Sequence, residues 1–373
     1  MNEKSNAVLT VGFFTVIILI FTIADWLTGD RIYSENENRM LATRPKFSAE
    51  TLLDGSFMED YETYVTDQFV GRDTWVELKT RGDVLLQKKV INGVYLGEDD
   101  YLIEQHLSKD IKQEDVDKKI ALLNGLVEKY GAKAMLIPTA DNILSDKLPF
   151  QAEYFDQKQF LDRVEEVIGE ENLINVYDTL KAHAREDIYY RTDHHWTTLG
   201  AYYGYVVWKK QAGNTAVITF DPDHLTTVTD EFLGTLHSKL NLPHRKDSIQ
   251  TFPETMLKQP MITYDFQTVT YTYYEEKYLD TKNKYGYFLD DNHPFIEIET
   301  GYRRGRELVL LKNSYANCLV PLLANHYDKI YMIDLRYYNG KLDNLVDQYM
   351  TPGTDMLVLY DCIHFIEDFN YYK

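Results

Sequence analysis

Cysteine is scarce in this chain of 373 residues, because Cys318 and Cys362 are the only two. Two thiols do not make the disulfide framework that holds small secreted domains together. A hydrophobic core has to take that place, and 44% hydrophobic and 14% aromatic residues are enough to build one. We therefore expect a folded protein in which both cysteines are buried free thiols.

Positive charge is also in short supply. The chain has 39 lysines and arginines against 59 aspartates and glutamates, which gives a formal net charge of −20. Such a surface repels phosphate backbones and anionic lipid, so the composition argues against a nucleic-acid partner. A basic partner or a neutral polymer is compatible with it.

Long apolar runs are rare, and the single clear one is Ala7–Ala24, with 18 residues and no charge. This length is at the lower limit for a helix that crosses the hydrocarbon layer. A cleaved signal peptide has an apolar part of only about 7 to 15 residues, and Thr22–Ala24 is a poor cleavage site. A buried helix of a soluble protein is the remaining alternative. We predict that residues 1–27 are a single-pass anchor in the cell membrane and that the rest lies outside the cytoplasm.

A linker and helical region is expected over residues 28–112. The polar stretch Thr28–Ser48 shows neither a helical nor a strand period. Apolar residues recur at three- and four-residue steps over 51–90, which predicts helix. Residues 92–103 contain Asn-Gly and short apolar runs, which are typical of a β-hairpin.

From residue 113 to 373 helical and strand patterns alternate. This alternation predicts a three-layer α/β domain with a mostly parallel sheet covered on both faces. A Tyr/Thr-rich stretch at about 215–300 interrupts it and predicts an insertion of antiparallel strands. The expected helices are 113–130, 154–169, 197–211 and 315–326, and the expected strands are 133–138, 172–176, 307–311, 329–334 and 355–360.

Ser314 follows a predicted strand and precedes a predicted helix. Reactive groups of open parallel sheets gather at the carboxyl ends of the strands, where helix N-termini converge. A serine on such a turn has an exposed hydroxyl, and nearby backbone N–H groups suit a developing oxyanion. The alternative is an ordinary helix N-cap, a role that serine often takes.

The segment Asp193–Trp196 supplies the groups that a serine nucleophile needs. Residues two apart share a side in extended chain, so the Asp193 carboxylate could hold one nitrogen of His195. The other nitrogen would then be free to take the proton of a serine, a weak nucleophile without such a base. His194 would point elsewhere.

Two other interpretations of Asp193–Trp196 stay open. Aspartate and two histidines could bind a metal ion, although the chain has no HExxH or CxxC motif to support it. The aspartate-histidine-histidine phosphoesterases share these three residue types, but they also need an aspartate-rich motif near a first strand, and Met135–Asp141 supplies one acid only. The histidines could also be purely structural and pack under Trp196.

Several segments together resemble the bacterial DHHW proteins, relatives of the alginate O-acetyltransferase subunits of the SGNH superfamily. The two that carry the motif are Tyr190–Thr197 with Gly200–Tyr202, and Leu311–Asn317. Further segments follow in order along nearly the whole region after the anchor. They are Ser34–Arg39, Asp67–Arg72, Asn92–Gly97, Phe232–Thr235, Tyr285–Phe288 and Ile333–Tyr338.

This resemblance implies an SGNH-like fold in which Ser314 is the nucleophile, His195 the base and Asp193 its partner. It implies transfer of an acetyl group to a cell-surface or exported polysaccharide, beside a membrane-bound O-acyltransferase that supplies the acyl group, with no metal or other cofactor. Candidates for binding substrate or the oxyanion are Tyr315, His194, Asn292 and Arg191.

Two departures from the family pattern stand near these residues. Asn313 precedes the serine where relatives often carry aspartate, and Asp290–His293 replaces a turn that contains glycine. Two alternatives to acyl transfer stay open, namely a carbohydrate esterase of the same fold and a non-catalytic scaffold for polymer export or envelope assembly.

Overall fold

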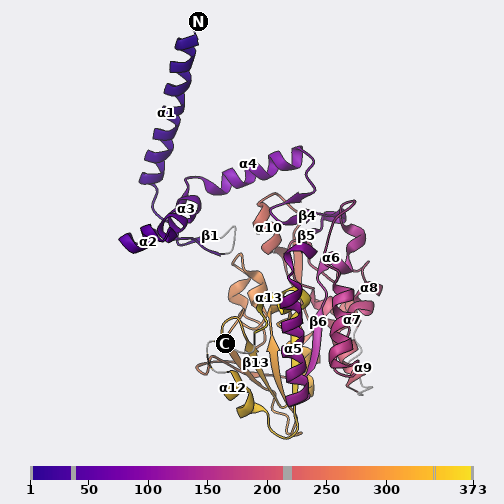
Figure 1. Ribbon diagram of the computed structural model, residues 1–373. Coiled ribbons are helices and arrows are strands. Elements are labelled where there is room, and N and C mark those ends of the chain that lie inside the picture. The colour runs from indigo at the N-terminus through magenta and orange to yellow at the C-terminus, as the bar shows by residue number, and fades with distance from the viewer. Residues whose placement is uncertain (1–2, 35–38, 213–220, 339, 341, 371–373) are drawn as a thin grey trace. The chain divides into compact units, whose positions relative to one another are not determined.

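The computed structural model describes residues 3–34, 39–212, 221–338, 340 and 342–370 (Figure 1). Residues 35–38 of the Ser34–Arg39 segment and residues 213–220 around the start of the predicted insertion lie outside this range. The chain divides into two compact units, and each is described by itself. The smaller comprises residues 1–88 with 238–243, and the larger comprises 89–237 with 244–373.

The smaller unit is mainly helical. Among the described residues, α1 is the one helix long and apolar enough to cross a membrane. The helices predicted over 51–90 are confirmed, whereas the polar stretch before them also contains a short antiparallel ribbon of β1 and β2. The elements are α1 Glu3–Leu27, β1 Tyr33–Ser34, β2 Arg39–Met40, α2 Ala49–Leu53, α3 Ser56–Gln68 and α4 Arg72–Leu85.

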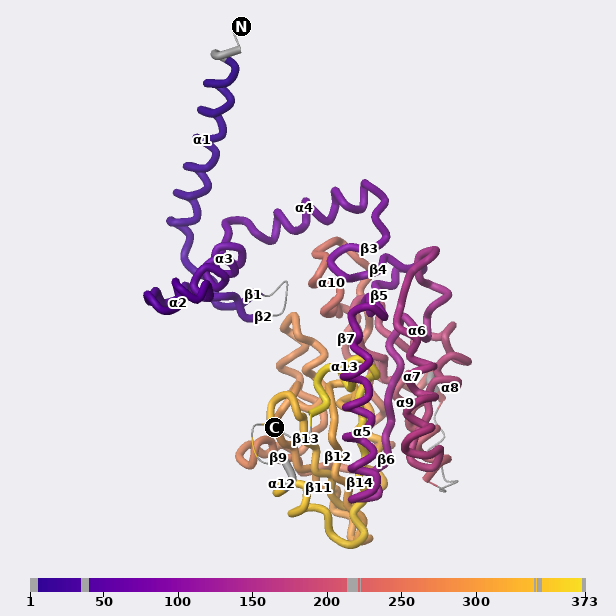
Figure 2. The backbone as a smooth tube through the Cα atoms, in the orientation of Figure 1, coloured from indigo at the N-terminus to yellow at the C-terminus, as the bar shows by residue number. Residues whose placement is uncertain are grey.

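A seven-stranded sheet in the order β10-β9-β11-β13-β12-β14-β6 forms the centre of the larger unit (Figure 2). Strands β13, β12, β14 and β6 are parallel, and β11, β9 and β10 extend the sheet in antiparallel fashion. The bounds are β6 Lys133–Ile137, β9 Met261–Tyr264, β10 Thr268–Thr270, β11 Phe295–Glu299, β12 Glu307–Lys312, β13 Lys329–Asp334 and β14 Thr354–Asp361.

Two hydrophobic clusters cover the two faces of this sheet. Alternate residues of β12 divide between them, Leu308 and Leu310 on one face and Val309 and Leu311 on the other. This period of two confirms three layers. The first face packs against α9 (Thr198–Gln211), and the second packs against α5 (Gln113–Tyr130), α7 (Gln157–Ile168), α12 (Leu342–Tyr349) and α13 (Cys362–Asp368).

Smaller elements complete the larger unit. The predicted hairpin is present as the antiparallel ribbon β3-β4-β5, and β7 pairs with β8. Both cysteines are buried free thiols, as expected. The bounds are β3 Val90–Ile91, β4 Val94–Leu96, β5 Leu102–Glu104, α6 Ala140–Ile143, α8 Tyr177–Ala182, β7 Thr226–Phe232, β8 Asp247–Thr251 and α11 Val320–Leu323, while α10 (Thr235–Leu240) runs from this unit into the smaller one.

Three predictions about this unit need correction. The described part of the β-rich stretch is not a separate insertion throughout, because β9, β10 and β11 join the main sheet and make half of its pairings antiparallel. The strand predicted at 172–176 is reduced to a single bridge at Leu173. The helix predicted at 315–326 is broken into short pieces, since Pro321 has no N–H to continue a helix from the preceding turn.

Candidate functional site

Ser314 lies at the carboxyl end of β12, between the ends of the neighbouring strands β13 and β14. The chain is extended at Asn313 and then enters a short 3₁₀ turn, Ser314–Ala316. The Asn313 side chain holds this corner, since its oxygen accepts from the Tyr315 N–H and its nitrogen donates to Asp361 at 2.6 Å. The amide thus keeps a hydrogen bond to Asp361 without a second carboxylate beside the serine.

His195 contacts both Ser314 and Asp193. Its Nε2 lies 2.7 Å from the Ser314 Oγ, and its Nδ1 lies 2.6 Å from an oxygen of Asp193. The predicted hydrogen bond between Ser314 and His195 is therefore present across 119 residues of sequence. With Nδ1 protonated and held by the carboxylate, Nε2 is the nitrogen able to accept the serine proton.

The local backbone differs from the extended chain that we expected. Tyr189 bridges to Trp196, and the residues between them form a tight loop. Within it, Asp193 Oδ1 accepts from the His195 N–H at 3.1 Å as well as contacting the ring. This Asx-type turn, rather than strand alternation, places the two side chains together.

Asp193 is buried and has several donors. Its second oxygen accepts from the Thr235 N–H at 2.8 Å and from the Thr235 hydroxyl at 3.1 Å. Burial alone would raise the pKa of Asp193, but the nearby histidines and these hydrogen bonds hold that pKa well below its ordinary value. Gly234 makes the approach possible, because a Cβ there would lie 2.3 Å from Asp193.

Aromatic rings fix the orientation of the histidine. Tyr285 stacks on His195 with ring centroids 3.8 Å apart, and its hydroxyl donates to the Ser314 carbonyl at 3.2 Å. The Trp196 indole donates to the Tyr315 carbonyl at 2.9 Å, and the Tyr315 hydroxyl donates to the His194 carbonyl. The loop that carries the histidine and the turn that carries the serine are thus joined directly.

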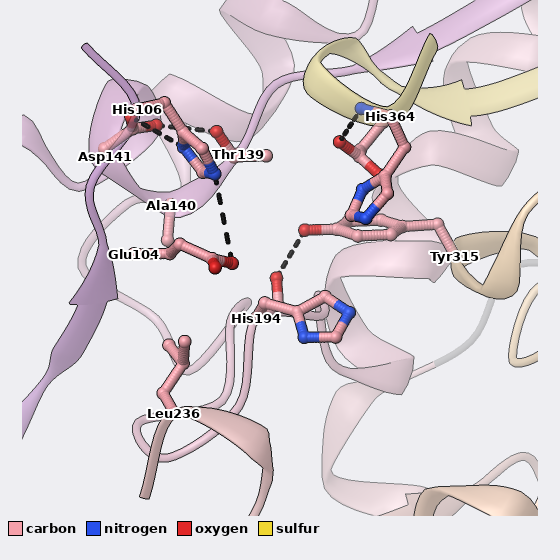
Figure 3. Close-up of a pocket in the computed structure, with 10 residues that line it drawn as sticks. Glu104, His106, Thr139, Ala140, Asp141, His194, Leu236, Tyr315 and His364 are labelled. Carbon is pink, nitrogen blue, oxygen red and sulfur yellow. Dashed lines mark hydrogen bonds and ion pairs between the residues drawn. The ribbon is translucent and has the colours of Figure 1, made fainter. Parts of the chain in front are cut away.

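His194 and Tyr315 also border a small pocket, shown in Figure 3. The His194 Nδ1 lies 2.8 Å from the Thr235 hydroxyl, and burial and the neighbouring His195 lower the pKa of His194 to about 4. The other lining residues are Glu104, His106, Thr139, Ala140, Asp141, Leu236, Asp361 and His364. His106, Asp361 and His364 were not among the site residues predicted from the sequence.

Two predicted site residues lie in other surroundings. The Asn292 side chain accepts from Lys312 and Arg336, which both pair with the buried Asp334, and none of its hydrogen bonds among the described residues reaches Ser314. Arg191 pairs with Asp187 at 2.7 Å and lies over the Tyr101 ring. Both therefore have structural partners in this state.

A metal ion is the other interpretation of the Asp193, His194 and His195 cluster. One ligand atom of each lies within 4.8 Å of the others, close enough to share an ion. Both ring nitrogens of His195 already have partners, Asp193 and Ser314. A metal at His195 would have to displace one of them, so the arrangement suits proton transfer better than metal ligation.

Comparison with known proteins agrees with the resemblance found in the sequence. Residues 89–333 match the DHHW protein family. The chain belongs to the DHHW family. A search of the curated proteins finds no match.

The solved structures that share the fold include the following two. A DHHW family protein from Eubacterium siraeum is 22% identical, covering 76% of this chain and 98% of its own, with a TM-score of 0.61. Bacillus cereus PatB1, solved with a sulfonyl adduct, is also 22% identical, covering 75% of this chain and 99% of its own, with a TM-score of 0.57.

Proposed function

We propose that this protein is an SGNH-type serine acyltransferase that moves an acyl group, most simply acetyl, onto a polysaccharide through an ester of Ser314. The observation that supports this is the continuous chain of contacts from Asp193 through His195 to Ser314, at 2.6 and 2.7 Å. These lengths are those of a base in hydrogen-bond reach of the group it activates.

The proposed reaction has two halves. The Ser314 oxygen attacks the donor carbonyl while His195 Nε2 takes its proton, and the proton then passes to the leaving group as the donor bond breaks. A sugar hydroxyl next attacks the acyl carbon, gives its proton to His195, and the proton returns to Ser314 as the ester breaks. The backbone N–H of Ser314 is our candidate for one oxyanion donor.

Charge stabilisation by Asp193 supports this assignment. A carboxylate whose pKa is far below its ordinary value stays ionised while the imidazolium forms beside it. Because Asp193 and His195 are only 3% and 5% exposed, water screens this attraction little. The pair is therefore suited to hold a proton for a short time and return it.

The proposed location is outside the cytoplasm. The α1 helix supports a single-pass anchor. The outer side of the membrane is proposed for the larger unit because an exported or cell-surface polysaccharide can be reached only there. There the chain would meet an exported or cell-surface polysaccharide and a membrane-bound O-acyltransferase that supplies acyl groups. The resemblance to alginate O-acetyltransferase subunits favours transfer over the esterase and scaffold alternatives.

A labelling experiment tests the nucleophile. The full-length protein in detergent is incubated with p-nitrophenyl acetate, or with a sulfonyl fluoride because Bacillus cereus PatB1 was solved with a sulfonyl adduct. We expect a burst of leaving group and one adduct on the peptide that contains Ser314, by mass spectrometry. Ser314→Ala should lose both, whereas Ser248→Ala, on the exposed face of β8, should keep both.

The alternatives predict other results. An esterase would release the acetyl group to water at a rate that added oligosaccharide does not change. A scaffold would show neither burst nor adduct, and this result would overturn the proposed function.

A further inference from the structure

The pocket in Figure 3 lies beside the proposed catalytic triad of Asp193, His195 and Ser314. The proposed acyl transfer gives no role to the titratable side chains that line it. His194 and Tyr315 both line the pocket, and each is adjacent in sequence to one of the proposed catalytic residues, His195 and Ser314. Its free volume is about 10 Å³, which is roughly the space of one water-sized group. A hydroxyl group fits this space, and a whole sugar ring does not.

Two further histidines that line the pocket are each held by a buried aspartate. His364 Nδ1 lies 2.7 Å from Asp361, and His106 Nδ1 lies 3.1 Å from Asp141. Neither carboxylate side chain is exposed to solvent. With Nδ1 anchored in this way, the Nε2 of each ring is the nitrogen left to bind a ligand, and His106 Nε2 lies 3.9 Å from Glu104.

The charge of the pocket follows from these pairs. Asp361 raises the pKa of His364 to about 9. Burial would lower the pKa of His106, but the hydrogen bond and charge of Asp141 raise it above its ordinary value. His194 is neutral near pH 7. At most two cationic rings, those of His364 and His106, therefore face the three carboxylates of Glu104, Asp141 and Asp361, and at least one negative charge is in excess.

We propose that this pocket binds a hydroxyl group of the acceptor sugar, and that the acceptor is a neutral or amino-sugar polymer rather than a polyuronate. The inference rests on the proposed acyl transfer at Ser314. A hydroxyl both donates and accepts, so it can bridge the 3.9 Å between the His106 Nε2–H and the Glu104 carboxylate. In Figure 3 these two side chains and His194 border the same space.

The arrangement of the ligand groups favours a hydroxyl over a metal ion. Among the described residues, the cluster Asp193, His194 and His195 is the only group of three ligands within 4.8 Å of one another. Glu104, His106 and His364 are not such a group, although their residue types would suit zinc. A bound hydroxyl spans the longer separations, and a neighbouring hydroxyl of the same sugar ring would then be directed to the acyl carbon on Ser314.

The experiment separates acylation from acceptor use. Full-length protein in detergent is mixed with p-nitrophenyl acetate, and the burst measures formation of the acetyl-enzyme. Discharge is then followed with chitopentaose as neutral acceptor, a chitosan oligomer as amino-sugar acceptor and an oligogalacturonate as anionic acceptor. Transfer is detected as O-acetylated sugar by mass spectrometry.

Variants at Glu104 test the pocket. Its partly exposed side chain lets Glu104→Ala and Glu104→Gln fold, and the burst reports an intact triad in each. We expect Glu104→Ala to reduce acceptor-dependent discharge about 10- to 100-fold, much more than it reduces the burst. Glu104→Gln, which keeps an accepting oxygen, should recover part of the rate. Glu170→Gln, an exposed control, should behave as the wild type.

The outcomes are distinct. Faster discharge with the neutral or amino-sugar oligomer than with oligogalacturonate, reduced in Glu104→Ala, supports the proposal. The pocket proposal is overturned if Glu104→Ala lowers burst and discharge equally or leaves discharge unchanged. It is also overturned if oligogalacturonate is preferred or if none of the three oligomers speeds discharge. In each of these cases a wild-type burst still supports the proposed function. Tight binding of Zn²⁺ in calorimetry, lost in Glu104→Ala, would identify a metal site instead. Absence of the wild-type burst overturns both proposals.

Discussion

Two aspartate–histidine pairs in this protein have nearly the same contact and different surroundings. The Asp193 carboxylate lies 2.6 Å from His195, and the Asp361 carboxylate lies 2.7 Å from His364. The His195 side chain is 6% exposed, stacks on Tyr285 and has Ser314 on its second nitrogen. The His364 side chain is 30% exposed, and its ring faces the pocket.

A carboxylate beside a histidine is not sufficient to make that histidine a base at neutral pH. Asp361 raises the pKa of His364 to about 9, so this ring is already charged at neutral pH and cannot accept a proton there. Both carboxylates divide their oxygens among several donors, Asp193 between His195 and Thr235, and Asp361 between His364, Asn313 and the Ile363 N–H. Three features distinguish the Asp193–His195 pair: the Ser314 hydroxyl within hydrogen-bond distance of His195, the Tyr285 ring stacked on the imidazole, and the low solvent exposure of the histidine.

Removing the charge of Asp193 or of Asp361 should give the largest difference in the rate of acetyl-enzyme formation. In Asp193→Asn the amide no longer favours the required His195 tautomer, so acetyl-enzyme formation should fall about 10⁴-fold. Asp361→Asn leaves His195 and Ser314 in contact and keeps an oxygen that can accept from the Asn313 amide next to the serine, so the same rate should fall by less than about 10-fold. Burst kinetics at pH 7, with a thermal melt of each variant, measure both. Equal losses in the two variants would contradict the distinction.

Filling the space beside Asp193 should have the next largest effect. In Gly234→Ala the new Cβ would lie 2.3 Å from the carboxylate side chain, which must move. A shift of about 1 Å at a catalytic group can lower the rate about 10²-fold, and we expect a loss of that order in the burst rate. Gly125→Ala in α5, where nothing lies within 4 Å, is the matched control. It should stabilise the protein by about 0.5–1 kcal/mol with no change in rate.

The Asp361–His364 pair should make the stability of the folded protein depend on pH. The pKa of His364 is raised to about 9 in the folded state, so its contribution is fully present below its unfolded pKa of about 6.5. That contribution is lost as the pH rises through 9. Urea unfolding should therefore show His364→Gln less stable than wild type by on the order of 1–3 kcal/mol at pH 6. The difference should shrink by pH 10, and a constant difference would show that His364 is not charged.

The sequence predicted the elements that bury one regular face. The α5 helix has the predicted bounds, 113–130, because its apolar residues follow the helical period and Gly131 ends it in a left-handed conformation. The antiparallel character of 261–270 was also correct. Which sheet those strands would join was not predictable, since alternation shows that a strand has one buried face and not which neighbour it pairs with.

The two aspartate–histidine pairs of the pocket, Asp361–His364 and Asp141–His106, could be predicted from the sequence only in part. Asp361 ends β14 and Asp141 follows β6, so the rule about carboxyl ends of parallel strands that pointed to Ser314 also applies to them. The partner of Asp141, His106, lies 35 residues earlier on a loop, and no local pattern indicates that contact. Tyr285 was noted only within a matched segment, because stacking on His195 depends on tertiary packing.

The stacked Tyr285 ring gives the smallest test of the comparison, because within the described part of the chain only Asp193–His195 of the two pairs has such a ring, and the Tyr285 hydroxyl is also hydrogen-bonded to the Ser314 backbone. Tyr285→Phe keeps the ring that stacks on His195 and removes the hydroxyl that donates to the Ser314 carbonyl at 3.2 Å. We expect a loss of about 0.5–1.5 kcal/mol in stability and less than about a threefold change in burst rate. Tyr285→Leu removes the flat face as well, so His195 can tilt, and its burst rate should fall further than that of Tyr285→Phe at equal acceptor and pH. If the two variants have the same burst rate, the ring does not orient the histidine, and the low exposure of His195 together with the Asp193 contact must be sufficient.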